Sequence, residues 1–213
     1  MELSGIKNLI FDLGGIIINI DFQRTFEAFA RAAGKDVLGV VRKFEDERIF
    51  ARFEKGDLNE AEVRFLINKE LNTALSDEET DKAWNALLMD IPPPRIEMLR
   101  ELAKNHRIFL LSNTNSIHIR EVNNILHKSN GIPSLNQLFE RVYYSYEIHM
   151  SKPSTEIYEF VLMQNGLKAT ETLFIDDNID NIRGAAATGL QTLHINYPEE
   201  SVTDHLVWKK KIK

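Results

Sequence analysis

The stretch Asn8-Leu9-Ile10-Phe11-Asp12-Leu13-Gly14-Gly15 decides the fold, because an apolar run ends there in a carboxylate followed by two glycines. The run has the length of a β-strand and lacks apolar–polar alternation, as expected for a strand buried on both faces. Glycines let the backbone approach a ligand closely, so the turn after Asp12 is a candidate binding site. A tight turn in which Asp12 bonds to its own backbone would explain the same residues without a ligand.

Four more short, β-rich apolar runs follow along the chain. Together with the first, they predict strands at Asn8–Leu13, Ile108–Leu111, Arg141–Tyr146, Thr172–Ile175 and Thr192–Ile195. Apolar residues at helical spacing precede the second, fourth and fifth runs, at 96–103, 157–162 and 182–186. Strands that alternate with helices predict an α/β fold with a doubly wound parallel sheet, which binds ligands at the carboxyl ends of its strands.

A long helical segment interrupts this alternation after the first strand. From about Asp21 to Met89 the sequence has no strand signal, and Asn59–Glu62 and Ser76–Glu79 each match a capping box, a pattern that begins helices. A segment of roughly 70 residues far exceeds ordinary loops of about 2–6 residues. We therefore expect a helical cap domain at residues 19–89, inserted into a core formed by residues 1–18 and 90–213.

Composition narrows the class of protein. The 213 residues are 43% hydrophobic, enough for a sizeable core, and the net charge of −6 disfavours nucleic acid and anionic membranes as partners. Without cysteine there is no disulfide, no thiolate metal site and no cysteine nucleophile. No apolar run approaches the roughly 20 residues of a membrane span, and Asp12 interrupts the only candidate leader. We expect a cytoplasmic protein with a solvated basic tail at residues 208–213; its oligomeric state stays open.

Polar clusters also follow three of the other predicted strands: Ser112-Asn113-Thr114-Asn115, Ser151-Lys152-Pro153 and Asp176-Asp177-Asn178-Ile179-Asp180-Asn181. Hydroxyl and amide groups at a helix start can cradle an anion, and a lysine that opposes the helix dipole is easier to explain beside one. Each cluster alone has a simpler explanation, as a helix cap or an exposed loop lysine. Converging carboxylates at positions 12, 176 and 177 would repel without a cation, and oxygen-only ligands point to Mg²⁺.

In their order, the four clusters resemble the four motifs of the haloacid dehalogenase (HAD) superfamily, and the helical insertion resembles its small helical cap. Phe11–Gly15 with Asn19–Phe22, and Asp176–Asn181, are similar to the branch that contains α-D-glucose-1-phosphate phosphatase. The resemblance implies a Mg²⁺-dependent phosphatase that hydrolyses a small phosphorylated metabolite, such as a hexose 1-phosphate, through an aspartyl-phosphate intermediate.

The resemblance also implies a nucleophile and a metal site. Asp12 would attack phosphorus and form the covalent intermediate. Asp12, the backbone carbonyl of Gly14 and Asp177 would hold Mg²⁺, with Asp176 assisting directly or through water.

A phosphate site is implied in the same way. Ser112, the backbone amide of Asn113 and Lys152 would bind the phosphoryl oxygens, and Lys152 would stabilise transition-state charge. Asn181 would orient one of the carboxylates.

One position departs from the family pattern. Most phosphatases of this superfamily carry a second aspartate two residues after the nucleophile as general acid and base; here, as in the branch that contains α-D-glucose-1-phosphate phosphatase, that position is a glycine, Gly14. A good leaving group, such as that of a sugar 1-phosphate, is our preferred explanation. Asp21 or His118 could instead supply the proton, although we expect Asp21 to cap the first cap helix and His118 to be a solvated helix residue. Weak catalysis, with phosphorylated ligands mainly bound, is the third explanation.

Other functions and other substrate contacts remain open at this point. A non-catalytic phosphate-binding protein, a haloacid dehalogenase and a phosphomutase could share the fold, but the intact nucleophile, the paired carboxylates and Gly14 respectively argue against them. Within the cap, the turn Phe53–Asp57 is a candidate for substrate contact, with Arg24, Arg48 and Arg52 as possible anion partners. The simpler interpretation makes Phe53 part of the cap core and the arginines solvated charges.

Overall fold

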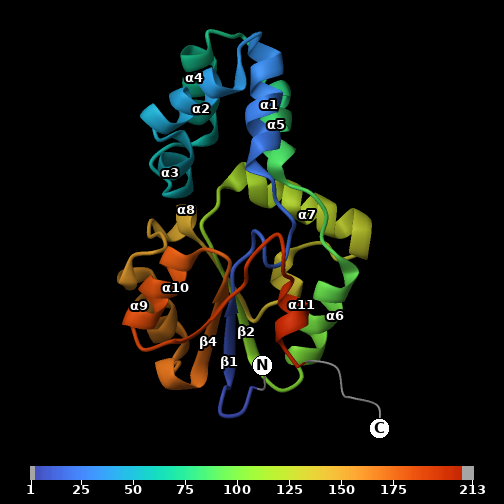
Figure 1. The fold of residues 1–213 in the computed structure, drawn as a ribbon, viewed down its shortest axis with the longest axis vertical. Coiled ribbons are helices and arrows are strands. Elements are labelled where there is room, and N and C mark those ends of the chain that lie inside the picture. The colour runs from blue at the N-terminus through green and yellow to red at the C-terminus, as the bar shows by residue number, and fades with distance from the viewer. Residues whose placement is uncertain (1–2, 208–213) are drawn as a thin grey trace.

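One parallel sheet forms the centre of the protein. The computed structural model describes residues 3–207, so the predicted basic tail at 208–213 lies outside the described residues. The strands are β1 (Asn8–Phe11), β2 (Arg107–Ser112), β3 (Arg141–Tyr144), β4 (Thr172–Asp176) and β5 (Gln191–His194). They pair in the order β3-β2-β1-β4-β5, every pair parallel (Figure 1). The predicted α/β fold with a parallel sheet is confirmed.

The edge strand β3 is shorter than predicted. Its last residue, Tyr144, pairs with Ser112, which is also the last residue of β2. With no further partner on that side, the ladder ends, and Ser145 begins the short helix α8 (Ser145–Ile148).

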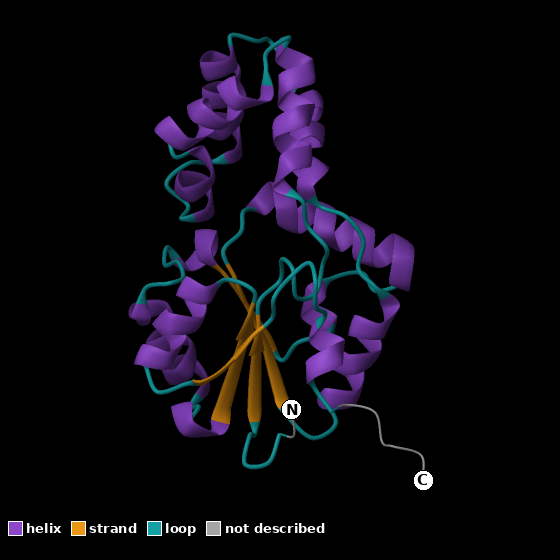
Figure 2. Ribbon diagram, viewed as in Figure 1, coloured by secondary structure: helices purple, strands orange, loops and turns teal. Residues whose placement is uncertain are grey.

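Helices cover both faces of the sheet (Figure 2). Successive strand residues point to opposite faces, so Leu9 and Phe11 pack in one cluster and Ile10 in another. The first cluster includes residues of α6 (Pro93–Leu102), α7 (Ser116–Asn130) and α11 (Val202–His205). The second includes residues of α9 (Thr155–Asn165) and α10 (Ile179–Ala187). Short 3₁₀ helices lie at Asn85–Leu87, Leu135–Gln137 and Ala169–Glu171.

The segment after β1 is helical, as predicted, and stands beyond the carboxyl edge of the sheet (Figure 1). Its helices are α1 (Phe22–Ala33), α2 (Val37–Asp46), α3 (Ile49–Glu54), α4 (Glu60–Leu71) and α5 (Asp77–Trp84). Both predicted capping boxes are formed, at the starts of α4 and α5. Phe29, Phe44, Phe53 and Trp84 belong to a buried cluster of this segment, and Trp84 stacks on Phe50 with ring centroids 4.4 Å apart.

The chain leaves and re-enters the core at neighbouring points, which supports our proposed boundaries of the cap at residues 19–89. The Asn19 N–H donates to the Asp90 carbonyl, and Asn19 Nδ2 donates to Asp90 Oδ1, both at 2.9 Å. The cap also contacts the start of α7, where Trp84 Nε1 donates to Asn115 Oδ1 at 3.2 Å. Within residues 3–207, no helix combines the length and apolar character needed to cross a membrane.

Candidate active site

A buried lysine joins the ends of two adjacent strands. Asp12 follows β1 and Asp176 ends β4, and Lys152 Nζ lies 2.7 Å from Asp12 Oδ1 and 2.6 Å from Asp176 Oδ2. The Lys152 side chain is only 1% exposed, so the explanation as an exposed loop lysine is wrong. Because a buried ammonium needs compensating charge, the two carboxylates stabilise its protonated form, and the pKa of Lys152 is raised.

Asp177 completes a cluster of three carboxylates. One oxygen from each of Asp12, Asp176 and Asp177 lies within 4.8 Å of the others. The pKa of Asp12 is raised to about 7: burial is the largest cause, the neighbouring carboxylates also raise it, and Lys152 partly opposes them. Burial and the charge of Asp176 raise the pKa of Asp177 to about 6. A single lysine therefore leaves the cluster short of positive charge. An all-oxygen donor set with excess negative charge fits Mg²⁺, the predicted cofactor.

The three carboxylates differ in how freely they could bind an ion. Asp176 is fully buried, and both its oxygens accept protein hydrogen bonds: Oδ1 from the Asn178 amide at 2.8 Å, Oδ2 from Lys152, and both from Asn181 Nδ2 at 3.1 Å. This arrangement leaves Asp12 and Asp177 as the more available ligands and favours contact through water for Asp176.

The two glycines after Asp12 meet different neighbours. A Cβ at Gly15, which has φ +68°, would lie 2.5 Å from Asp177 Oδ2, so only glycine lets the turn approach that carboxylate. A Cβ at Gly14 would lie 2.8 Å from Ile20 Cδ1. The space that a second aspartate would enter is therefore occupied by an apolar side chain.

The predicted phosphate-binding residues come from the end of β2, which pairs with β1 on the side opposite β4, and from the lysine segment. Asn113 and Lys152 are joined reciprocally: Asn113 Nδ2 donates to the Lys152 carbonyl at 2.9 Å, and the Lys152 amide donates to Asn113 Oδ1 at 3.0 Å. Ser112 is 3% exposed, and its hydroxyl donates to the Asn113 carbonyl at 3.4 Å. These bonds fix the loop after β2 against the lysine segment.

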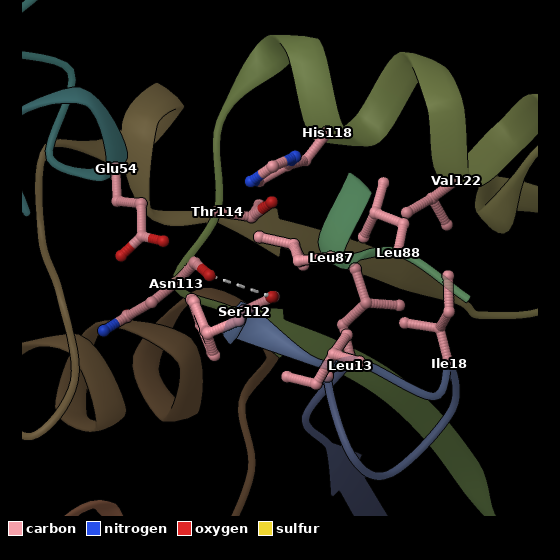
Figure 3. A pocket seen from close by; sticks show the side chains of 13 residues that line it. Leu13, Ile18, Glu54, Leu87, Leu88, Ser112, Asn113, Thr114, His118 and Val122 are labelled. Atoms are coloured by element: carbon pink, nitrogen blue, oxygen red, sulfur yellow. Dashed lines mark hydrogen bonds between the residues drawn. The ribbon is translucent and has the colours of Figure 1, made fainter. Parts of the chain in front are cut away.

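Two adjoining spaces open above these residues. The first, which we call the acidic cleft, has a volume of about 350 Å³ and is lined by Asp12, Lys152 and Asp177, among others. The second, which we call the apolar cavity, has a volume of about 60 Å³ and is shown in Figure 3. Six residues line both spaces and so mark where they meet: Gly14, Ile20, Phe22, Glu54, Ser112 and Asn113.

His118 lines the apolar cavity, and the expectation that it is a solvated helix residue is wrong. It is 5% exposed, its ring stacks on Trp84 with centroids 5.4 Å apart, and Nδ1 lies 2.9 Å from Asn85 Oδ1. Burial lowers its pKa to about 3, so the imidazole is neutral. The helix packs this way because the cap rests on the start of α7, which the sequence pattern of the helix does not reveal.

The other candidate residues that the sequence singled out in the cap do not line the site, and several stabilise the fold of the cap. Asp21 caps α1, where its side chain accepts from the Gln23 amide at 3.0 Å, as expected. Phe53 is buried in the cap, and Arg52 pairs with Glu47 at 3.9 Å. The described residues that line the acidic cleft and the apolar cavity do not include Arg24, Arg48 or Arg52.

Glu54 is a site residue that sequence reasoning included in a candidate turn but did not single out. It ends α3, within the turn that the sequence marked for substrate contact, and Figure 3 shows its side chain directed toward the loop of Ser112 and Asn113. Burial raises its pKa to about 7, against the opposing charge of Lys152. Its place in that turn was the only available signal, because nothing local distinguishes Glu54 from its acidic neighbours.

Comparison with known proteins places the chain in a family. Residues 6–189 match the haloacid dehalogenase-like hydrolases. D-ribitol-5-phosphate phosphatase from Bacteroides thetaiotaomicron is 31% identical over 187 residues, which cover 88% of this chain and 90% of that protein.

Solved structures agree with the sequence matches. A HAD family enzyme from Bacteroides thetaiotaomicron, in complex with magnesium and inorganic phosphate, is 36% identical with a TM-score of 0.85, covering 92% of this chain and 96% of that one. A HAD-like hydrolase from Porphyromonas gingivalis is 26% identical with a TM-score of 0.80, covering 89% and 90%. The resemblance read from the four motifs is thereby confirmed, and the chain belongs to the haloacid dehalogenase-like hydrolases.

Proposed function

We propose that this hydrolase is a Mg²⁺-dependent phosphatase that hydrolyses a small phosphomonoester through an aspartyl-phosphate on Asp12. The observation that carries the proposal is the buried group formed by Asp12, Lys152 and Asp176, with Asp177 beside it at the carboxyl edge of the sheet. A site for binding alone would not need a buried carboxylate held beside a lysine at the floor of a cleft. The phosphatase activity named for the relative from Bacteroides thetaiotaomicron supports the same conclusion.

In this proposal each residue of the site has a distinct role in the reaction. Asp12 attacks phosphorus, while Lys152, the Ser112 hydroxyl and the Asn113 amide bind the phosphoryl oxygens and stabilise charge as it develops. Asp176 holds Lys152 in place, Asn181 orients Asp176, and neither reacts. Mg²⁺, held by Asp12, the Gly14 carbonyl and Asp177 with Asp176 nearby, would offset the charge of the phosphate and keep Asp12 ionised.

The substrate is a phosphorylated sugar or polyol in this proposal. Hexose 1-phosphate comes from the sequence resemblance and D-ribitol 5-phosphate from the named relative, and both are small enough for a cleft of about 350 Å³ closed by the cap. We also propose a cytoplasmic location, where such metabolites are made.

A substrate panel tests the proposal. Glucose 1-phosphate, glucose 6-phosphate, D-ribitol 5-phosphate, glycerol phosphate and p-nitrophenyl phosphate would be assayed for phosphate release with Mg²⁺. Turnover should disappear in chelator and in Asp12→Asn. Full activity under either condition would refute the mechanism, and binding of phosphate without turnover of any ester would identify a binding protein instead.

A further inference from the structure

The loss of a carboxylate at Gly14 leaves the reaction without its usual proton donor. A poor leaving group such as an alkoxide needs a proton as its bond to phosphorus breaks, and general acid catalysis contributes typically about 10²–10⁴-fold. Ile20 fills the space beside Gly14, so a carboxylate cannot stand there without displacing it. The donor must therefore come from another part of the site, or the leaving group must be good.

The two candidates seen in the sequence do not fit this role. Asp21 is exposed and its carboxylate caps α1. His118 is buried as a neutral imidazole, stacked on Trp84 and bonded to Asn85. A histidine whose pKa is about 3 is not an imidazolium at neutral pH, and the N–H of a neutral imidazole is too weak an acid to take the place of a carboxylic acid.

Glu54 has the position that the missing acid requires. It lines the acidic cleft together with Asp12 and Lys152, and it lines the apolar cavity together with Ser112 and Asn113. It therefore stands where the two spaces meet, on the cap side of the site, whereas Asp12 and the phosphate-binding residues belong to the core. A leaving group that extends from the phosphate toward the cap passes this position.

The Glu54 side chain is also free to act. In the described part of the chain its carboxylate makes no hydrogen bond or ion pair, although the other acidic residues of the site are bonded within the protein or converge on the metal cluster. Its backbone is fixed instead. The Ser145 hydroxyl donates to the Glu54 carbonyl and accepts from the Thr114 amide at 2.9 Å, which ties the end of α3 to the loop after β2.

The protonation state suits a donor as well. Burial raises the Glu54 pKa to about 7, so a large fraction carries a proton near neutral pH. A dianionic phosphate entering the cleft would repel a charged carboxylate and favour the protonated form further.

We propose that Glu54, from the cap, is the catalytic residue that protonates the leaving group in place of the absent aspartate, an inference that rests on the phosphatase function proposed above. In the first step Asp12 forms a bond to phosphorus, the bond from phosphorus to the ester oxygen breaks, and the Glu54 proton moves to that oxygen to release an alcohol. In the second step a water molecule attacks phosphorus and gives a proton to Glu54. The bond between phosphorus and Asp12 then breaks, which releases phosphate and restores the Asp12 carboxylate.

The test compares leaving groups in Glu54→Gln. Nitrophenolate is a good leaving group that needs no proton, whereas an alkoxide must be protonated as it leaves. In Glu54→Gln, kcat/KM should therefore fall by about 10²–10⁴-fold on the most active alkyl phosphate of the panel. On p-nitrophenyl phosphate kcat/KM should change less than about 10-fold, since this parameter reports events only up to release of the leaving group. Glu45→Gln, an exposed cap residue on α2 away from both spaces, is the matched control and should behave as wild type.

Each result separates the inference from the proposed function. An equal loss on both substrates would assign Glu54 to binding or structure, and no loss on either would remove it from the mechanism; both results overturn the inference while leaving a phosphatase. A wild type that hydrolyses aryl but not alkyl phosphates overturns it too. Absence of all turnover in wild type would refute the proposed function first, and the inference with it. Equal thermal melting of wild type and Glu54→Gln excludes misfolding.

Discussion

Replacing Lys152 with methionine tests whether the site depends on one buried cation. Lys152→Met keeps the length of the side chain but removes the charge that lies 2.7 Å from Asp12 and 2.6 Å from Asp176. The Asp176 side chain is 0% exposed and that of Asp12 12%, so water can replace little of the stabilisation that the lysine supplies. Removing one partner of a buried ion pair typically costs about 3–5 kcal/mol of stability.

That loss is large enough to measure by thermal or denaturant unfolding. For a chain of this size, about 3–5 kcal/mol corresponds to a fall in Tm of roughly 6–20 °C. The measurement is made in chelator at pH 7.5, so that no bound cation substitutes for the lysine. Lys168→Met is the control, because Lys168 is 75% exposed and 3.8 Å from Glu171, and it should unfold like wild type.

The loss should depend on pH in a defined direction. The pKa of Asp12 is about 7 in the folded wild type and 3.8 in an unfolded chain, and loss of Lys152 raises the folded value further. A carboxyl with a raised folded pKa contributes stability at low pH that disappears as the pH rises through that pKa. The penalty of Lys152→Met should therefore shrink between pH 7.5 and pH 5. A variant as stable as Lys168→Met at pH 7.5, or an equal penalty at both values, would refute the reasoning.

Three further perturbations have defined outcomes. Asp12→Asn should abolish turnover yet raise Tm in chelator at pH 8, because ionised Asp12 is then an unfavourable buried charge; near pH 5, below its folded pKa of about 7 but above its unfolded value of 3.8, the gain should be smaller, and a gain independent of pH would contradict this. Trp84→Ala should cost about 3–5 kcal/mol in urea unfolding, since Trp84 is fully buried in the cap, whereas Phe65→Ala, 71% exposed, should cost little. Gly14→Asp should lower Tm through its contact with Ile20, and Gly14→Asp combined with Ile20→Ala should recover part of the loss; strictly additive losses would show that Ile20 is not the obstacle.

Much of the architecture could be predicted because its signals are local. Unbroken apolar runs such as the one ending at Asp12 indicate strands buried on both faces, and the intervening helices force those strands to be parallel. Parallel strands end at one edge of the sheet, so Asp12 and Asp176 had to converge there once both strands were identified. Capping boxes at Asn59 and Ser76 placed two cap helices in the same way, since a cap involves only four consecutive residues.

The sequence by itself thus determined the parallel sheet, the helical insertion and the carboxylates at the strand ends, because each depends on neighbours in the chain. Tertiary structure alone decided the rest. His118 is buried because the cap packs on α7, Ile20 fills the space beside Gly14, and Glu54 faces the site because Ser145 fastens the end of α3 to the core. The contacts of His118 and Glu54 join residues far apart in the sequence, and that of Ile20 with Gly14 spans a turn; in neither case does a periodicity or motif record which side chains meet.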